Sequence, residues 1–135
     1  MVNDMVIRLG YVAISKVLDI TSSGTITYTN YQKEKNKEER LDHIIKSNLE
    51  NLEKILNYNV KNNIHFYRLT SKLIPLATHK DVSFEYINRY KDYYDQISKI
   101  INKNNMRVDA HPDQFCVLNS TNKETINNSI EILKY

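Results

Sequence analysis

Two histidines stand where this sequence could form a metal site or a catalytic site. His111 follows the short run of residues 107–110 and precedes Pro112. Proline cannot donate to a sheet, so a strand that reaches His111 must stop there. His79 falls in the loop after an earlier apolar run, residues 64–69. The carboxyl ends of parallel strands bind ligands in α/β folds, and neutral imidazoles bind divalent metals. One histidine is not a metal site, so the alternative for His111 is a strand cap bonded to a loop carbonyl.

Charged residues recur at alternate positions in the same segments. Side chains alternate between the faces of a strand, so Asp109 shares a face with His111. Arg68 is the matching residue in the second apolar run, and Arg8 in the first. Branched apolar side chains normally fill a barrel interior, so Arg8, Arg68 and Asp109 indicate a polar, functional interior near its top. The alternative is an internal ion pair, Arg8 or Arg68 with Asp109, that only supports the fold.

Three strands, each followed by a helix, can be predicted from hydrophobic spacing. The strands are predicted at residues 6–11, 64–69 and 106–111. Apolar residues at helical spacing predict helices that begin near Asn36, Ser83 and Thr121. Asn36 and Thr121 each have a glutamate three residues later, which is typical of a capping box. Residues 12–37 are predicted to be a long polar loop, a length that is uncommon without a function.

This alternation predicts an α/β fold with a parallel sheet covered by helices. A complete (β/α)₈ (TIM) barrel takes about 250 residues and eight such units. The chain has 135 residues and three units, and three parallel strands alone would leave two unpaired edges. We therefore predict an incomplete TIM barrel, in which residues 1–135 form the N-terminal portion of a single domain.

Composition limits the classes of function. The formal net charge of +3 permits a nucleic-acid partner without predicting one. No apolar run approaches the roughly 20 residues that cross a bilayer, and the N-terminus lacks the layout of a secretory signal. The single cysteine, Cys116, excludes an internal disulfide and is expected to be a small buried filler. We expect a cytoplasmic protein with no membrane partner.

The ordered blocks at residues 8–12, 48–56, 65–79 and 106–115 closely resemble the N-terminal part of the UV damage endonucleases, a family of metal-dependent DNA repair nucleases. The resemblance runs from about Val6 to Tyr135. It implies a TIM barrel that nicks double-stranded damaged DNA on the 5′ side of lesions such as pyrimidine dimers. The implied cofactor is a divalent metal, commonly manganese, with several ions in the full-length protein. That protein is expected to be a monomer.

The resemblance also implies roles for single residues. His111 and His79 correspond to metal ligands, and Gln114 and Phe115 to the pair that probes the lesion. Phe115 packing in the core is the alternative for that ring. Other possible contacts to DNA or its backbone are Tyr11, Lys72, Asn119 and Ser120.

Two other interpretations remain open. The chain could be part of another metal-dependent TIM barrel, an abasic-site nuclease or a sugar isomerase, although a sugar pocket has no need of the wedge that Gln114 and Phe115 would form. It could instead be an inactive truncated fragment or a DNA-binding remnant. The 135-residue chain alone is expected to be inactive, because the family's further ligands come from later strands.

Overall fold

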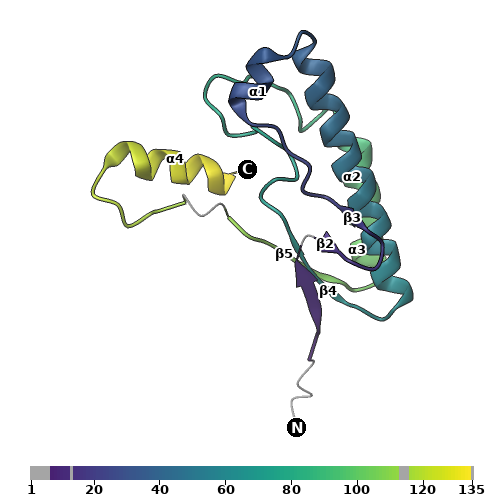
Figure 1. The fold of residues 1–135 in the computed structure, drawn as a ribbon. Coiled ribbons are helices and arrows are strands. Elements are labelled where there is room, and N and C mark those ends of the chain that lie inside the picture. The colour runs from purple at the N-terminus through teal and green to yellow at the C-terminus, as the bar shows by residue number, and fades with distance from the viewer. Residues whose placement is uncertain (1–6, 13, 113–115, 135) are drawn as a thin grey trace.

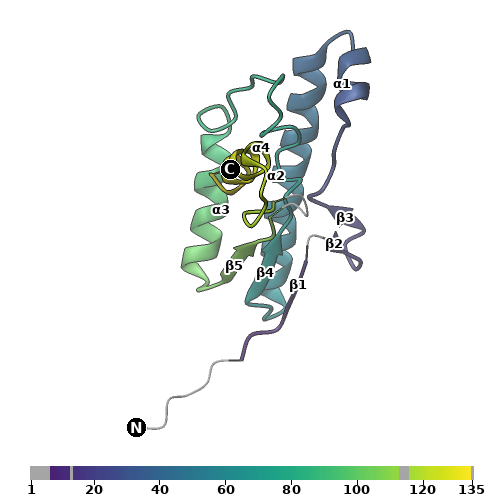
Figure 2. The same ribbon diagram turned by 90° about the vertical axis from the view of Figure 1, so that its left-hand side faces the viewer.

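A three-stranded parallel sheet lies at the centre of the computed structural model, which describes residues 7–12, 14–112 and 116–134. Its strands are β1 (Gly10–Val12), β4 (Phe66–Leu69) and β5 (Arg107–Ala110) (Figure 1), and β4 lies in the middle (Figure 2). Tyr11 pairs with Tyr67, which pairs with Val108 on the other side. Within the described ranges the outer edges of β1 and β5 have no strand partner, as an incomplete barrel predicts.

Two helices cover one face of this sheet. Helices α2 (Lys37–Lys61) and α3 (Lys91–Lys103) pack side by side there (Figure 2). The apolar stripe predicted for α2 faces the sheet, and Glu38 and Glu39 in its first turn suit the positive helix N-terminus. The chain leaves α2 through Asn63 at φ 57°, in the left-handed region that asparagine tolerates better than most residues.

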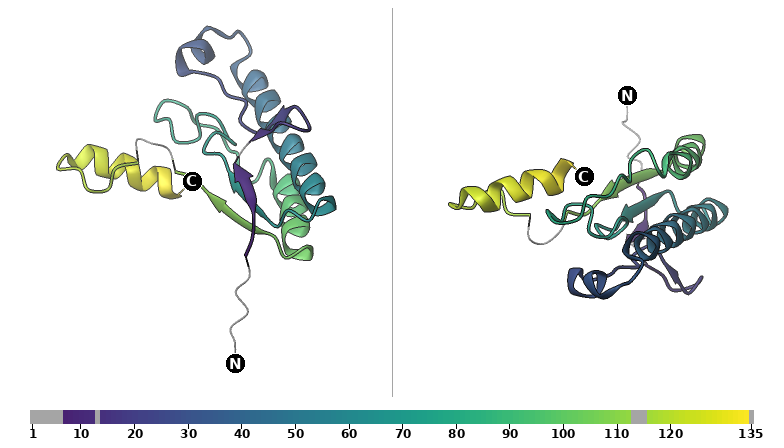
Figure 3. Two further views of the ribbon diagram at one scale, coloured as in Figure 1. Left: turned by 60° about the horizontal axis from the view of Figure 1, so that its bottom comes forward. Right: turned by 90° about the horizontal axis from the view of Figure 1, so that it is seen from above.

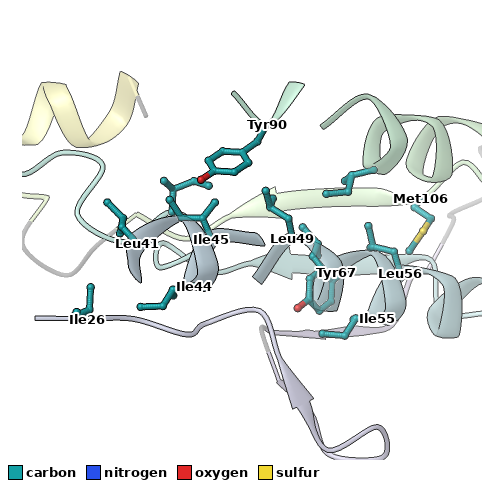
Figure 4. Close-up of a cluster of buried hydrophobic side chains, with 13 residues drawn as sticks. Ile26, Leu41, Ile44, Ile45, Leu49, Ile55, Leu56, Tyr67, Tyr90 and Met106 are labelled. Atoms are coloured by element: carbon teal, nitrogen blue, oxygen red, sulfur yellow. The ribbon is translucent and has the colours of Figure 1, made fainter. Parts of the chain in front are cut away.

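The hydrophobic core lies between α2, α3 and the sheet (Figure 4). Tyr67 of β4 is fully buried in it, and its ring meets the ring of Tyr11 edge-on at 5.4 Å. The side chains of the other sheet face are less covered, which leaves that face open for contacts. The buried hydrophobic residues are Ile26, Leu41, Ile44, Ile45, Leu49, Leu52, Ile55, Leu56, Tyr67, Ile74, Tyr90, Ile97 and Met106.

The N-terminal region differs from the sequence prediction. The first strand is β1, not residues 6–11, so Arg8 precedes it. Gly10 explains the position: a Cβ there would lie 1.9 Å from the carbonyl oxygen of Phe66, so only glycine allows this close pairing. The predicted loop at residues 12–37 contains an antiparallel pair, β2 (Ile14–Ser15) with β3 (Ile20–Thr21), and the short helix α1 (Tyr28–Lys33).

The predicted helix starts also need correction. Helix α3 begins at Lys91 and not near Ser83, because the aromatic residues before it pack against the core as a loop. Asn36 precedes α2, but its side chain donates to the Glu39 carboxylate and accepts no backbone N–H.

The last helix, α4 (Lys123–Lys134), is capped by Asn122 and not by Thr121, since the Asn122 side chain accepts from the backbone N–H of Glu124 and Thr125. Helix α4 stands apart from α2 and α3 and is reached through the chain that leaves β5 (Figure 3). None of the described helices is both long and apolar enough to span a bilayer.

Candidate functional site

A cavity of about 700 Å³ opens at the carboxyl ends of β4 and β5. The end of β4 and the following loop, residues 69–78, form most of its wall. His111 and Pro112 close it on the side of β5, and Ile132 and Leu133 of α4 contribute from above the sheet. The cavity therefore lies where an α/β fold normally binds its ligand.

His111 directly follows β5 and is exposed at this cavity. Its backbone N–H donates to the Leu69 carbonyl at 3.3 Å, which continues the strand pairing as far as the histidine. Its ring Nδ1 lies 2.6 Å from the carbonyl oxygen of Pro112. A carbonyl only accepts, so Nδ1 carries the proton and Nε2 of the neutral ring keeps its lone pair. Metal-binding histidines commonly donate one ring N–H to a carbonyl and bind the metal through the other nitrogen. The His111 side chain is therefore suited to act as a metal ligand.

His79 lies at the far end of the same loop, and its ring is held by two contacts. Its Nδ1 accepts a hydrogen bond from the backbone N–H of Asp81 at 3.3 Å. Its face stacks on the ring of Tyr28 from α1, with 4.1 Å between centroids and 17° between planes. Because Nδ1 accepts, Nε2 carries the proton in the neutral ring. Ligation of a metal through Nε2 therefore requires the bond to Asp81 to break.

Arg68 and Asp109 form a two-pronged ion pair across β4 and β5, on the open face of the sheet. Arg68 Nε and Nη2 lie 2.9 and 3.1 Å from the two carboxylate oxygens of Asp109. The hydrogen bond from Arg68 lowers the pKa of Asp109, and Asp109 raises the pKa of Arg68. The structure thus contains an Arg68–Asp109 pair, one of the two pairs that the sequence left open, and both side chains are partly exposed. The pair holds the two strands in register directly below His111.

Arg8 is not brought to this end of the sheet. It lies beside a second cavity, of about 260 Å³, together with Asn63, His65 and Asn105. Asn63 and His65 lie between α2 and β4, and Asn105 lies between α3 and β5. This second cavity is therefore at the amino ends of these strands. The expected placement of Arg8 near the top of the interior is therefore not what the structure shows.

The predicted DNA contacts are spread over different surroundings. Tyr11 packs on the helix side, where its hydroxyl donates to Asn59 Oδ1 at 2.6 Å. Lys72 is exposed and lines the large cavity. Ser120 helps to form the turn before α4 by accepting from the Asn122 N–H, and the neighbouring Asn119 is exposed. Their roles in binding DNA stay predictions.

The lesion-probing pair, Gln114 and Phe115, lies outside the described residues. Cys116 is half-buried, and its Sγ lies 3.7 Å from the carbonyl oxygen of Ser129. The hydroxyl of Ser129 also accepts from the backbone N–H of Val117 at 2.8 Å. These contacts tie the chain at residues 116 and 117 to helix α4.

Sequence reasoning missed the residue that joins two walls of the cavity. Asn48 of α2 is buried, and its amide nitrogen lies 2.8, 3.2 and 3.0 Å from the carbonyl oxygens of Gly24, Lys72 and Leu73, which share its two N–H groups. Its Oδ1 accepts from the Gly24 N–H at 2.7 Å. An asparagine within the apolar stripe of α2 was the available signal, because a buried polar side chain normally has partners.

The described residues do not by themselves form a complete metal site. They contain no group of three or more histidine, cysteine, aspartate or glutamate side chains that could hold an ion. His111 and His79 are the two candidates that the loops after β4 and β5 provide. Metal binding by both histidines stays a prediction.

Comparison with known proteins shows which family this chain resembles. Residues 7–135 match the family described as UV-endonuclease UvdE. The chain is 37% identical over 134 residues to a UV DNA damage endonuclease of Bacillus cereus (strain B4264), and equally identical to one of Bacillus anthracis (strain A0248). The match covers 97% of this chain and 42% of each relative, so the chain spans less than half of their length.

A solved structure agrees with this fold. The crystal structure titled SacUVDE superposes with a TM-score of 0.87 and 34% identity, over 95% of this chain and 43% of that chain. The three βα units are thus part of a TIM barrel, which confirms the fold predicted from the sequence.

Proposed function

Because the chain belongs to the UV-endonuclease UvdE family, we propose that it is the N-terminal part of a DNA repair endonuclease. The proposed activity is a nick in the phosphodiester backbone of double-stranded DNA, on the 5′ side of UV lesions such as pyrimidine dimers. The full-length protein would act as a cytoplasmic monomer. It would use divalent metal ions, and manganese is the ion that we propose. The 135-residue chain would be inactive alone.

The observation that carries the proposal is the state of His111. The histidine stands at the carboxyl end of β5, beside a large cavity, and the contact of Nδ1 with the Pro112 carbonyl places the lone pair of the neutral ring on Nε2. His79, from the adjacent loop, would be the second ligand. Bound divalent ions would activate water and neutralise the phosphate, which a phosphodiester needs because its leaving group is poor. This chain would position the two imidazoles, because His79 lies in the segment after β4 and His111 directly follows β5.

The other residues would bind the DNA. Lys72, exposed at the cavity, carries a charge suited to a phosphate. Gln114 and Phe115 would enter the duplex at the lesion, because an amide and an aromatic ring can fill the space of bases that have left the stack. Their position in the sequence, two and three residues after Pro112, supports this role.

The proposal is tested with the purified chain and with a chimera. The chimera joins residues 1–135 to the C-terminal part of the Bacillus cereus relative that lies beyond the matched region. UV-irradiated plasmid and Mn²⁺ are incubated with each. We expect the chimera to nick irradiated plasmid and the 135-residue chain to leave it intact.

Two variants of the chimera assign the site. His111→Ala should abolish nicking while retaining salt-sensitive DNA binding, which rests on phosphate contacts. His43→Ala, at an exposed position on α2, is the matched control and should nick like the unmodified chimera. Full nicking by the His111→Ala chimera would contradict the proposed metal site, and efficient nicking by the chain alone would contradict its expected inactivity.

A further inference from the structure

The ring of His79 is held by Tyr28, a residue 51 positions earlier in the sequence that no motif indicated. The two rings are nearly parallel, 4.1 Å apart at their centroids. Tyr28 is itself fixed within α1: Gln32 Nε2 donates to its hydroxyl at 2.6 Å, and the ring of Tyr31 stacks on it at 6.5 Å. Thr27 caps this helix by accepting from the Asn30 N–H. The stacking partner of His79 is therefore part of an ordered element.

The two contacts of His79 respond differently to a metal. The contact with the Asp81 N–H is made by the edge of the ring and needs a lone pair on Nδ1. Ligation through Nε2 moves the proton to Nδ1, so the edge contact breaks. The contact with Tyr28 is made by the face of the ring, and it persists whichever nitrogen is protonated. Of these two contacts, the stack is the one that can keep the plane of the imidazole fixed in both states.

We propose that Tyr28 is a positioning residue for His79: its ring keeps the plane of the His79 imidazole fixed when metal binding breaks the edge contact. This inference rests on the proposed function, since it takes His79 as a metal ligand. In this role Tyr28 would act through His79 and would not bind the metal itself. Outer partners that orient a metal-binding histidine commonly change metal affinity when they are removed.

The test uses the full 135-residue chain with Mn²⁺ alone as the probe. Imidazole ¹H–¹³C spectra of the native chain, with the His79 signals assigned from a His79→Gln variant, are recorded before and during a Mn²⁺ titration. Tyr28→Leu removes the stacked ring. Tyr28→Phe keeps the ring but removes the hydroxyl, so it is the matched conservative variant. Urea unfolding of each variant separates a loss of orientation from a loss of fold.

In the metal-free spectra, the His79 ring signals should move downfield in Tyr28→Leu, because the shielding by a stacked ring disappears, and should stay in place in Tyr28→Phe. The Mn²⁺ concentration that broadens the His79 signals should rise about 10-fold in Tyr28→Leu, the lower end of the effect of removing an outer partner, and should be restored in Tyr28→Phe. The His43 signals should not change in either variant.

Three results would overturn parts of this reasoning separately. His79 signals that do not move in Tyr28→Leu would show that the stack is absent. A moved ring with unchanged Mn²⁺ broadening would show that the stack does not position a ligand. Mn²⁺ that broadens neither His79 nor His111 in the native chain would show that the two imidazoles do not hold the ion in this chain and so would overturn a role of Tyr28 in metal binding here, while the metal-free spectra would still decide on the stack.

Discussion

Replacing Asn48 by leucine should cost this fold about 2 kcal/mol of unfolding free energy. The side chain is 1% exposed, its two N–H groups are shared among three carbonyls, and its Oδ1 accepts from the Gly24 N–H. These contacts amount to about three full hydrogen bonds, so at about 1 kcal/mol net for each bond their sum is near 3 kcal/mol. Burying the leucine side chain in place of the amide gives back only about 1 kcal/mol of unfolding free energy. The gain is this small because the surrounding carbonyls lose their hydrogen-bond donor and remain buried.

The matched control is Asn51→Leu, one turn further along α2. Asn51 is half-buried and donates a single hydrogen bond, to the Thr21 carbonyl at 2.9 Å. Its replacement should cost about 1 kcal/mol. Urea unfolding followed by circular dichroism measures both variants, and the slope of free energy against urea should stay constant so that the midpoints can be compared.

Hydrogen exchange adds a local measurement to the Asn48→Leu test. The amide of Gly24 donates directly to Asn48, so its protection should fall by more than that of the α2 amides. An Asn48→Leu variant that unfolds within about 0.5 kcal/mol of Asn51→Leu, with unchanged protection at Gly24, would refute the view that Asn48 joins the two cavity walls.

Other parts of the structure lead to three further predictions. Gly10→Ala should destabilise the chain by about 1–3 kcal/mol, seen as a lower urea midpoint, because the new Cβ meets the Phe66 carbonyl oxygen at 1.9 Å; an unchanged midpoint would contradict the pairing of β1 with β4. The lowered pKa of Asp109 stabilises the fold above the unfolded carboxyl pKa of about 3.9, and this contribution is lost as the pH falls through the lowered pKa. Arg68→Met should therefore lose more stability near pH 7 than at low pH, and a pH-independent loss would argue against the pair. In the full-length context, Phe115→Ala should weaken damaged-duplex affinity by about 10- to 100-fold, since base stacking is worth roughly 1–3 kcal/mol; equal weakening for undamaged duplex at fixed salt would assign the ring to the core instead.

The parts of the site that depend on neighbouring residues in the sequence could be predicted. A strand that ends at His111 follows from an apolar run and a proline, and both are local signals. The pair of Arg68 with Asp109 was foreseen as an alternative, because alternation within two adjacent parallel strands puts both residues on one face.

Contacts between distant segments could not be predicted in the same way. Nothing near His79 in the sequence points to Tyr28, since stacking leaves no pattern along the chain. The start of α3 was misplaced because Ser83 can cap a helix only if the next residues are free to turn, whereas Phe84 and Tyr86 pack against the core. Tertiary packing there overrides the local preference for a helix start.

The parallel sheet also has a consequence for the order in which the chain assembles. Tyr11 bonds to Asn59, 48 positions away, and Arg68 bonds to Asp109, 41 positions away. Closing loops of this length costs conformational entropy before any strand pair forms. The 25 residues of α2, whose backbone hydrogen bonds are local, can form before those loops close. β1 has three residues and one edge without a strand partner among the described residues, so we expect it to open more readily than β4, which is paired on both sides, and native-state hydrogen exchange compares the two. The pairing of β4 with β5, which positions His111, therefore has to wait for a long loop to close, whereas α2 does not.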